Sequence, residues 1–155
     1  MDVKMTLTGN AGADMDAFID DILDTCLRPA AHAGVLVFYN EARALVGVKD
    51  GVLRDSIYRV HSESLSSRTT QAYEVSWNHF KAPHGYNVEN GHWRVNELVR
   101  TENGTWIATK IRLKTPVRVP AHSFIRRAYD NQADASVVAA QQRFSDLFQE
   151  IPDRD

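Results

Sequence analysis

The chain has 155 residues, of which 43% are hydrophobic and 25% are charged, so its composition is typical of one globular domain with a sizeable core. Its net charge of −2 excludes the strongly basic class of general nucleic-acid binders. The single cysteine, Cys26, excludes an internal disulfide and fits a reducing compartment. Neither a membrane-spanning run nor a signal peptide is expected.

Hydrophobic spacing in the first 46 residues predicts a strand followed by two helices. Residues 3–8 alternate between apolar and polar side chains, as in a half-buried strand. Asp14 is a natural N-cap for a helix over about 15–28. Pro29 cannot sit inside a regular helix, so we expect a break there and a second, more apolar helix over about 30–46.

The stretch from Gly47 to Ile57, GVKDGVLRDSI, predicts a corner between that helix and a strand. Gly47 and Gly51 allow a sharp turn, including positive φ. Leu53 and Ile57 are the apolar anchors of the corner. We expect the strand to begin at Ser56 and Ile57.

The middle of the chain predicts a first hairpin and then an irregular connection. Residues 56–62 and 71–78 read as two paired strands with a long polar loop between them. Residues 79–92 lack a clean period. Pro83 marks a turn in that segment, and residues 86–90 fit one helical turn.

A second hairpin is predicted over residues 93–119. Asn103-Gly104 separates two β-prone runs and is the preferred pair of a two-residue type I′ turn. Such a turn would oppose Glu97 with Lys110 and Val99 with Ala108. Pro116 and Pro120 are expected to end the sheet.

Ser123 is a natural N-cap for a last helix that starts at Phe124 and is expected to kink within residues 130–134. The resulting order β, α, α, β, β, β, β, α predicts an α+β fold with a mostly antiparallel sheet. We expect a single domain over 1–155, with a loose tail from about residue 152.

Four residues that lie close together in the sequence could form a metal site. They are His79, His84, Glu89 and His92. Their spacing matches no zinc signature, so surface or turn histidines are the favoured interpretation. No serine lies in a G-x-S-x-G context, and Cys26 lies on an apolar helix stripe.

Two sets of charged residues are better interpreted as solvent-exposed faces than as catalytic or binding sites. Asp20, Asp21 and Asp24 are best interpreted as a solvated acidic helix face. The alternate positions Lys110, Arg112 and Lys114 make a basic stripe on one strand face. An ordinary solvated face is favoured there over contacts with phosphates or an acidic partner, because the whole chain is slightly acidic.

Three separated segments nevertheless resemble one family, the neck or tail-completion proteins of long-tailed bacteriophages. GVKDGVLRDSI resembles the pattern P-V-D-T-G-x-L-R-x-S-I through Val48, Gly51, Leu53, Arg54, Ser56 and Ile57, and departs from it at Gly47, Lys49 and Asp50. APHGYNVENGH resembles A-P-Y-A-x-x-V-E-x-G-T through Ala82, Pro83, Val88, Glu89 and Gly91, and departs at His84 and His92. PAHSFIRRA resembles P-A-R-P-F-L-R-P-A through Pro120, Ala121, Phe124, Arg126 and Ala128.

The resemblance implies a structural virion protein without catalytic residues or cofactors. It implies a sixfold homo-oligomeric ring at the neck or tail end, assembled in the host cytoplasm around the DNA channel. The implied partners are the head-closure or connector protein, the tail terminator or the tail tube protein, and the genomic DNA in the lumen. Lys110, Arg112 and Lys114 would then contact the DNA or a partner.

Two other functions stay open from the sequence. One is a metal-dependent hydrolase that uses His79, His84, Glu89 and His92. The other is a small nucleic-acid-binding module that uses Lys110, Arg112 and Lys114.

Overall fold

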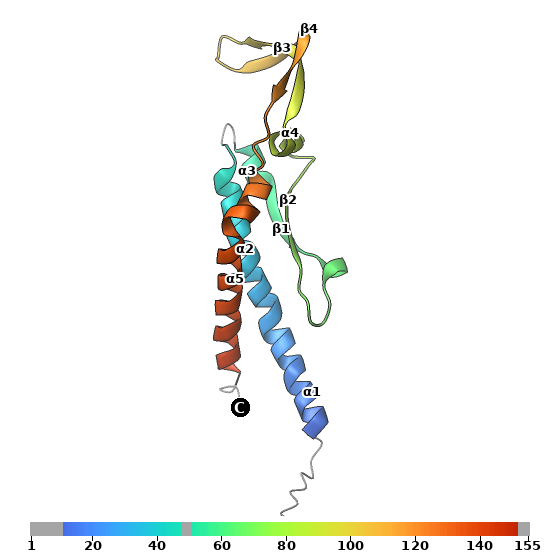
Figure 1. Cartoon of the computed structure of the whole chain (residues 1–155), viewed down its shortest axis with the longest axis vertical. Coiled ribbons are helices and arrows are strands. Elements are labelled where there is room, and N and C mark those ends of the chain that lie inside the picture. The colour runs from blue at the N-terminus through green and yellow to red at the C-terminus, as the bar shows by residue number, and fades with distance from the viewer. Residues whose placement is uncertain (1–10, 48–50, 152–155) are drawn as a thin grey trace, which may run out of the picture. The chain divides into compact units, whose positions relative to one another are not determined.

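The computed structural model describes residues 11–47 and 51–151, with side chains from residue 15 onward (Figure 1). The α+β fold class is confirmed. The helices are α1 (Ala11–Ile22), α2 (Arg28–Leu45), α3 (Val52–Ser56), α4 (Gly85–Asn90) and α5 (Phe124–Glu150). The strands are β1 (Ile57–His61), β2 (Tyr73–Trp77), β3 (His92–Arg100) and β4 (Trp106–Val119). The predicted strand at 3–8 and the tail from 152 lie outside the described residues.

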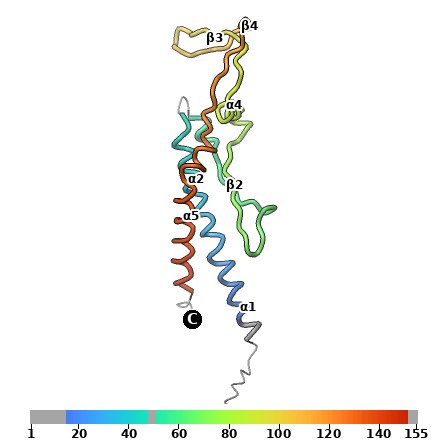
Figure 2. The backbone as a smooth tube through the Cα atoms, viewed as in Figure 1, coloured from blue at the N-terminus to red at the C-terminus, as the bar shows by residue number. Residues whose placement is uncertain are grey.

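The chain divides into two compact units, each built from segments that are far apart in the sequence (Figure 2). The first unit contains the described parts of 1–39, 59–75 and 132–155. The second contains 40–58 and 76–131, again within the described residues. The single domain over 1–155 stays a prediction.

The N-terminal helical region corrects two predictions. The helix begins at Ala11, so Asp14 lies inside it and is not its cap. The expected break at Pro29 is also wrong, because a π-helical turn over Leu23–Leu27 joins α1 directly to α2. A proline ring clashes with the carbonyl four residues before it in an α-helix, and the wider turn just before Pro29 relieves that crowding.

Close packing of α2 against α5 forms the core of the first unit. A Cβ at Gly34 would lie 3.1 Å from the backbone oxygen of Ser136, so these two helices approach closely at that point. Cys26, Ala30 and Val35 are buried. The burial of Cys26 agrees with its interpretation as a structural thiol.

The predicted corner after α2 is partly correct. Gly51 has a φ of 79°, in the left-handed region, and both Leu53 and Ile57 are buried. Residues 52–56, however, form the short helix α3, and the strand begins only at Ile57. The predicted pairing of the next two strands is confirmed, since β1 and β2 are neighbours in a two-stranded sheet.

The second hairpin exists, but its register differs from the prediction. Val99 pairs with Ile107 instead of Ala108. The Gly104 N–H donates to the Thr101 oxygen at 2.9 Å, and the Thr101 N–H donates to the Thr105 oxygen at 2.8 Å. With Gly104 at a φ of 82°, this is a three-residue loop, a type I turn followed by a left-handed glycine. The extra loop residue moves the partner of Val99 by one position. The predicted pairing of Glu97 with Lys110 is wrong, because Glu97 lies in a register shift between Asn96 and Leu98.

The hairpin forms its own two-stranded sheet, so the strands make two small sheets instead of the expected single one. Its register shifts between Arg94 and Asn96 and again between Asn96 and Leu98. Both shifts leave extra residues on β4, which has 14 residues against 9 in β3. Such bulges bend a strand, and β4 continues through Pro116, which was expected to end it.

Helix α5 begins at Phe124, as predicted, and continues to Glu150. The expected kink within residues 130–134 is therefore wrong. Among the described residues, no helix combines the length and the apolar character needed to cross a bilayer.

Candidate functional site

Glu89 joins two of the segments that carry the family resemblance. Its carboxylate belongs to α4 and is buried, with 8% of the residue exposed. The Ile125 N–H donates to Oε2 at 2.9 Å, and the Arg126 N–H donates to Oε1 at 3.1 Å. The first N–H groups of a helix have no partner within the helix, and the helix dipole favours negative charge there. Glu89 therefore caps α5 from 35 residues upstream of Phe124.

The expected capping role of Ser123 is corrected by this arrangement. Ser123 does precede the helix, but its hydroxyl donates to the backbone oxygen of Glu89 at 2.9 Å. Its φ of 45° lies in the left-handed region, which turns the chain into α5. Ser123 therefore holds α4 while Glu89 supplies the acceptors for the first turn of α5.

Gly91 allows the chain before α5 to pass directly over the end of α4. Its φ and ψ of 71° and 170° belong to a region that is essentially restricted to glycine. A Cβ at this position would lie 2.7 Å from both the Val119 oxygen and the Ala121 nitrogen. The His122 N–H also donates to the Val88 oxygen at 2.8 Å. These contacts fix the second and third motif segments against each other.

Apolar contacts extend this arrangement to the first motif segment. Phe124 is fully buried, and its ring lies edge-on to Trp77 with 5.6 Å between centroids. A Cβ at Gly85 would lie 2.3 Å from Trp77 Nε1 and 2.8 Å from Leu53 Cδ1. Leu53 thus packs where Gly85 leaves room. We call Leu53, Trp77, Gly85, Glu89, Gly91 and Phe124 the α4–α5 junction.

The remaining motif residues lie around the junction without a shared chemical role. The Ser56 hydroxyl donates to the Leu53 oxygen at 2.7 Å within α3. Arg54 is half-buried and contacts Asp55 at 3.3 Å. Val88 is half-buried, whereas Pro83, Pro120 and Arg126 are exposed. These residues support a structural role for the motifs.

The four residues of the metal hypothesis have separate surroundings. His79 packs on Trp77 with 4.7 Å between ring centroids, and His84 is exposed at the start of α4. Both Glu89 oxygens accept hydrogen bonds from α5. Among the residues that the structure describes, no group of three histidine, cysteine or acidic side chains could hold a metal ion.

A polar network that sequence reasoning missed lies in the loop between β1 and β2. Ser66 Oγ lies 3.1 Å from His61 Nε2, and that nitrogen lies 2.8 Å from Gln71 Oε1. The Gln71 amide nitrogen donates to the Ser67 oxygen, so the Gln71 amide oxygen faces His61 Nε2. The Ser66 hydroxyl donates to the Ser62 oxygen at 2.6 Å. His61 is therefore not placed as a base for Ser66, and the network orders the loop.

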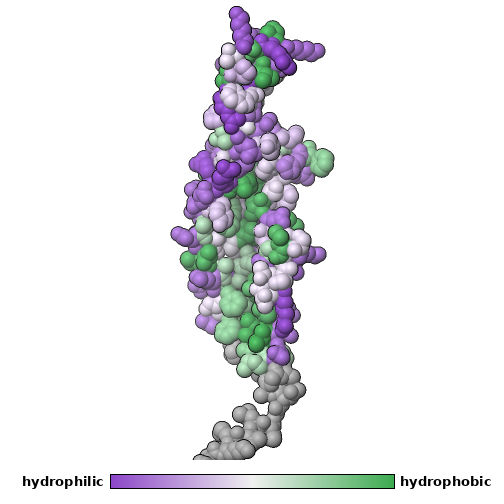
Figure 3. All heavy atoms as spheres, turned by 45° about the vertical axis from the view of Figure 1, so that its right-hand side comes forward, coloured by the Kyte–Doolittle hydropathy of each residue, from purple (hydrophilic) through white to green (hydrophobic). Residues whose placement is uncertain are grey.

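The second hairpin carries many of the exposed side chains of the second unit. Lys110, Arg112 and Lys114 are all exposed along β4, as the basic stripe predicts. Large apolar side chains are exposed beside them, including Trp106 at 58% and Ile111 at 60%. On the face shown in Figure 3, hydrophobic side chains lie among hydrophilic ones at this hairpin.

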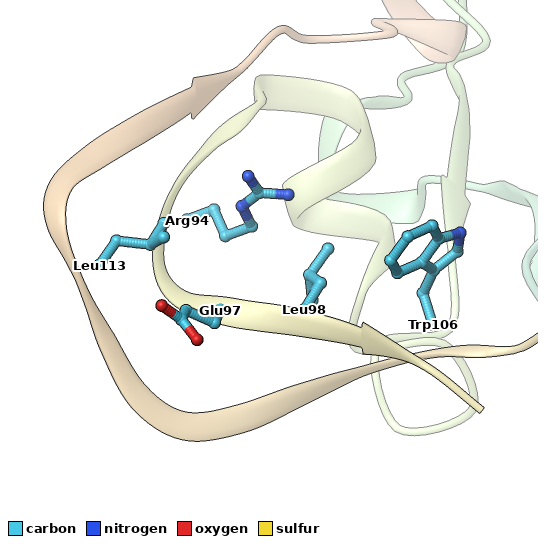
Figure 4. Close-up of a pocket in the computed structure, with 5 residues that line it drawn as sticks. All are labelled: Arg94, Glu97, Leu98, Trp106 and Leu113. Atoms are coloured by element: carbon cyan, nitrogen blue, oxygen red, sulfur yellow. The ribbon is translucent and has the colours of Figure 1, made fainter.

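The bend of the hairpin creates an open hollow of about 720 Å³ (Figure 4). In that view β4 runs as an outer arc around β3. Arg94, Leu98 and Trp106 extend from the same side of the hairpin, and Leu113 projects from β4 toward β3. We call Leu98, Trp106, Lys110, Arg112 and Lys114 the basic hairpin face.

Comparisons with protein-family models, with curated proteins and with solved structures found no match to this chain. The family resemblance therefore stays a prediction that rests on the three motif segments.

Proposed function

We propose that this chain is a structural subunit of a tailed-bacteriophage virion, which completes the neck or the tail end and joins the tail to the capsid. The observation that carries the proposal is the packing of the three motif segments on one another. Leu53 of the first segment meets Gly85 of the second, and Glu89 of the second caps the helix that begins in the third. Motif residues whose side chains pack and hydrogen-bond at one junction are what we expect of a structural protein.

The subunit acts as part of a homo-oligomeric ring, with six copies around the DNA channel, and belongs to either the neck ring or the tail terminator. Exposed apolar side chains on the hairpin and on α1 support this assembly role, because large apolar patches on soluble proteins mark interaction sites. Its other partners are the head-closure or connector protein and the tail tube protein. It assembles in the host cytoplasm and remains in the virion.

Particle morphology tests this function. Removing the gene from a phage that encodes this protein should leave filled heads and separate tails in electron micrographs of the lysate. Supplying the wild-type chain from a plasmid should restore joined, infectious particles. Supplying the Gly91→Val variant should not, because the added side chain collides with the backbone of Val119 and Ala121. Normal infectious particles without the protein would contradict the proposal.

A nucleic-acid-binding module is the second candidate function, favoured by the full exposure of the basic stripe. Each phosphate contact gives a slope of roughly −0.9 in log K against log salt concentration. If this function is correct, replacing Lys110, Arg112 and Lys114 with Gln should abolish DNA binding and its salt dependence. DNA binding that is unchanged in this variant would exclude the stripe as the binding surface.

A further inference from the structure

Helix α1 carries an apolar stripe that stays partly exposed. Met15, Phe18 and Ile19 follow the i, i+3, i+4 spacing of one helix face and are 59%, 46% and 42% exposed. Asp16 and Asp21 flank this face on its two sides. We call these five residues the acidic helix stripe. An apolar face of this kind on a helix end is typical of a surface that a partner buries.

Charge is strongly separated between this helix and the second hairpin. Residues 15–27 contain four aspartates and no lysine or arginine, a formal charge of −4. Residues 92–119 contain six lysines or arginines and two glutamates, a formal charge of +4. The whole chain carries only −2, whereas these two segments carry equal and opposite charges of 4.

We propose that the acidic helix stripe of one copy docks on the basic hairpin face of the next copy. Phe18 and Met15 then enter the hollow beside Leu98 and Trp106, and the flanking aspartates meet Lys110 and Lys114. Both surfaces are exposed, mixed apolar and charged, and opposite in sign, which favours association and fixes its orientation.

The two surfaces differ, so the contact is heterologous and copies add head to tail. Such contacts close into rings when the rotation permits and otherwise continue as filaments. This inference deepens the proposed function, on which the ring rests, by naming the two surfaces that join neighbouring subunits.

The side chains of the basic hairpin face favour a protein occupant over nucleic acid. Phosphate binding requires cations, and it does not account for the exposed Leu98 and Trp106. The acidic helix stripe supplies apolar side chains that match Leu98 and Trp106, and carboxylates that match the cations of this face.

A charge-swap experiment on the full chain tests the contact. The helix variant is Asp16→Lys with Asp21→Lys, and the hairpin variant is Lys110→Glu with Lys114→Glu. Asp20 is left unchanged because it pairs with Arg68. Arg127→Glu with Arg143→Glu on exposed positions of α5 is the control, since it reverses as many charges elsewhere. Circular dichroism verifies that each variant is folded, and analytical ultracentrifugation measures assembly.

We expect the wild-type chain and the α5 control to form oligomers, and each swapped variant alone to sediment as a monomer. An equimolar mixture of the two swapped variants should regain the wild-type oligomer. In the mixture, the reversed helix of one variant meets the reversed hairpin of the other, and the unchanged helix of the second variant meets the unchanged hairpin of the first, so both contacts join opposite charges. Raising the salt concentration should weaken the oligomer, since screening reduces these attractions.

Several results would overturn the inference. They are a wild-type monomer at every concentration, oligomers that persist in either variant alone, a mixture that stays monomeric, and an α5 control that also dissociates. Oligomers that persist in the hairpin variant while DNA retention is lost would assign the face to nucleic acid instead.

The contact and the proposed function can fail separately. Because sedimentation measures self-association alone, rescue in the mixture would stand even if the protein were absent from virions. Conversely, if heads and tails join normally in a phage that carries the hairpin variant, this contact is refuted but the proposed function is left intact.

Discussion

The α4–α5 junction and the second hairpin are adjacent in the sequence and are built in opposite ways. At the junction, Glu89 is 8% exposed and Phe124 is fully buried. On the hairpin, Trp106 and Ile111 are 58% and 60% exposed. The junction buries its large side chains within the chain, whereas the hairpin leaves its large side chains at the surface.

This difference indicates which region the fold depends on and which is open to a partner. Glu89 meets partners on α5 that are more than 30 residues away, so these hydrogen bonds fix a long-range arrangement. A two-stranded hairpin is marginally stable in isolation. Its side chains contribute little to folding when most of their surface stays in water. Substitutions should therefore affect stability at the junction and assembly at the hairpin.

The largest loss of stability is expected from Phe124→Ala. Deleting a fully buried phenylalanine ring removes its transfer free energy and leaves a cavity beside Trp77, a cost of about 3–5 kcal/mol. Urea unfolding followed by circular dichroism measures this loss. Phe80→Ala is the matched control, because Phe80 is 99% exposed and its removal should change stability by less than about 0.5 kcal/mol. Equal effects of the two substitutions would contradict the packing described for the junction.

Gly91→Ala should follow, with a loss of about 3 kcal/mol from backbone strain and from collision with the Val119 and Ala121 backbone. Gly104→Ala is a strict comparison, since Gly104 also has a positive φ but its nearest neighbour is a flexible arginine side chain at 3.6 Å. That variant should lose about 1–2 kcal/mol, from strain alone. The difference between the two unfolding free energies combines the close approach of chain segments at the junction with the greater strain of a side chain in the φ/ψ region of Gly91.

Glu89→Ala should destabilise the chain by about 1–3 kcal/mol, because it leaves two N–H groups of α5 without their acceptors. Glu89→Gln retains one acceptor oxygen and should lose about half as much. Hydrogen exchange at Ile125 and Arg126 should accelerate in both variants. Glu102→Gln, at the exposed hairpin loop, serves as the control. Unchanged exchange at these two amides would show that Glu89 is not the cap.

The contrast between Phe124 and Glu89 shows how far the sequence could predict this site. Ser123 before an apolar helical pattern correctly places the start of α5, because capping preferences are local. The group that caps the helix lies on α4, and no local pattern connects residues so far apart. Both the Ser123 hydroxyl and the Glu89 carboxylate could accept hydrogen bonds from the first turn of α5, and tertiary packing places the Glu89 carboxylate there.

Local rules also explain two of the errors in the backbone. Asn103-Gly104 predicts a hairpin turn, but a type I turn with a left-handed glycine uses the same two residues with one more residue in the loop. Pro29 predicts a helix break, whereas a π-helical turn before it accommodates the ring. In both cases the sequence permits two geometries of similar energy, and the sequence alone does not distinguish them.

The smallest effect on stability is expected at the hairpin, and it gives the sharpest test of the comparison. Ile111→Thr keeps a β-branched side chain on β4 and removes apolar surface that is already 60% exposed, so the unfolding free energy should change by less than about 0.5 kcal/mol. The same substitution at Ile57, which is 4% exposed on β1, removes buried apolar surface and buries a hydroxyl, at a cost of about 2–4 kcal/mol. Urea unfolding of the two variants compares the same substitution at an exposed position and at a buried position. If Ile111→Thr destabilised the isolated chain as strongly as Ile57→Thr, the hairpin would belong to the folding core, and its exposed side chains would no longer indicate a partner.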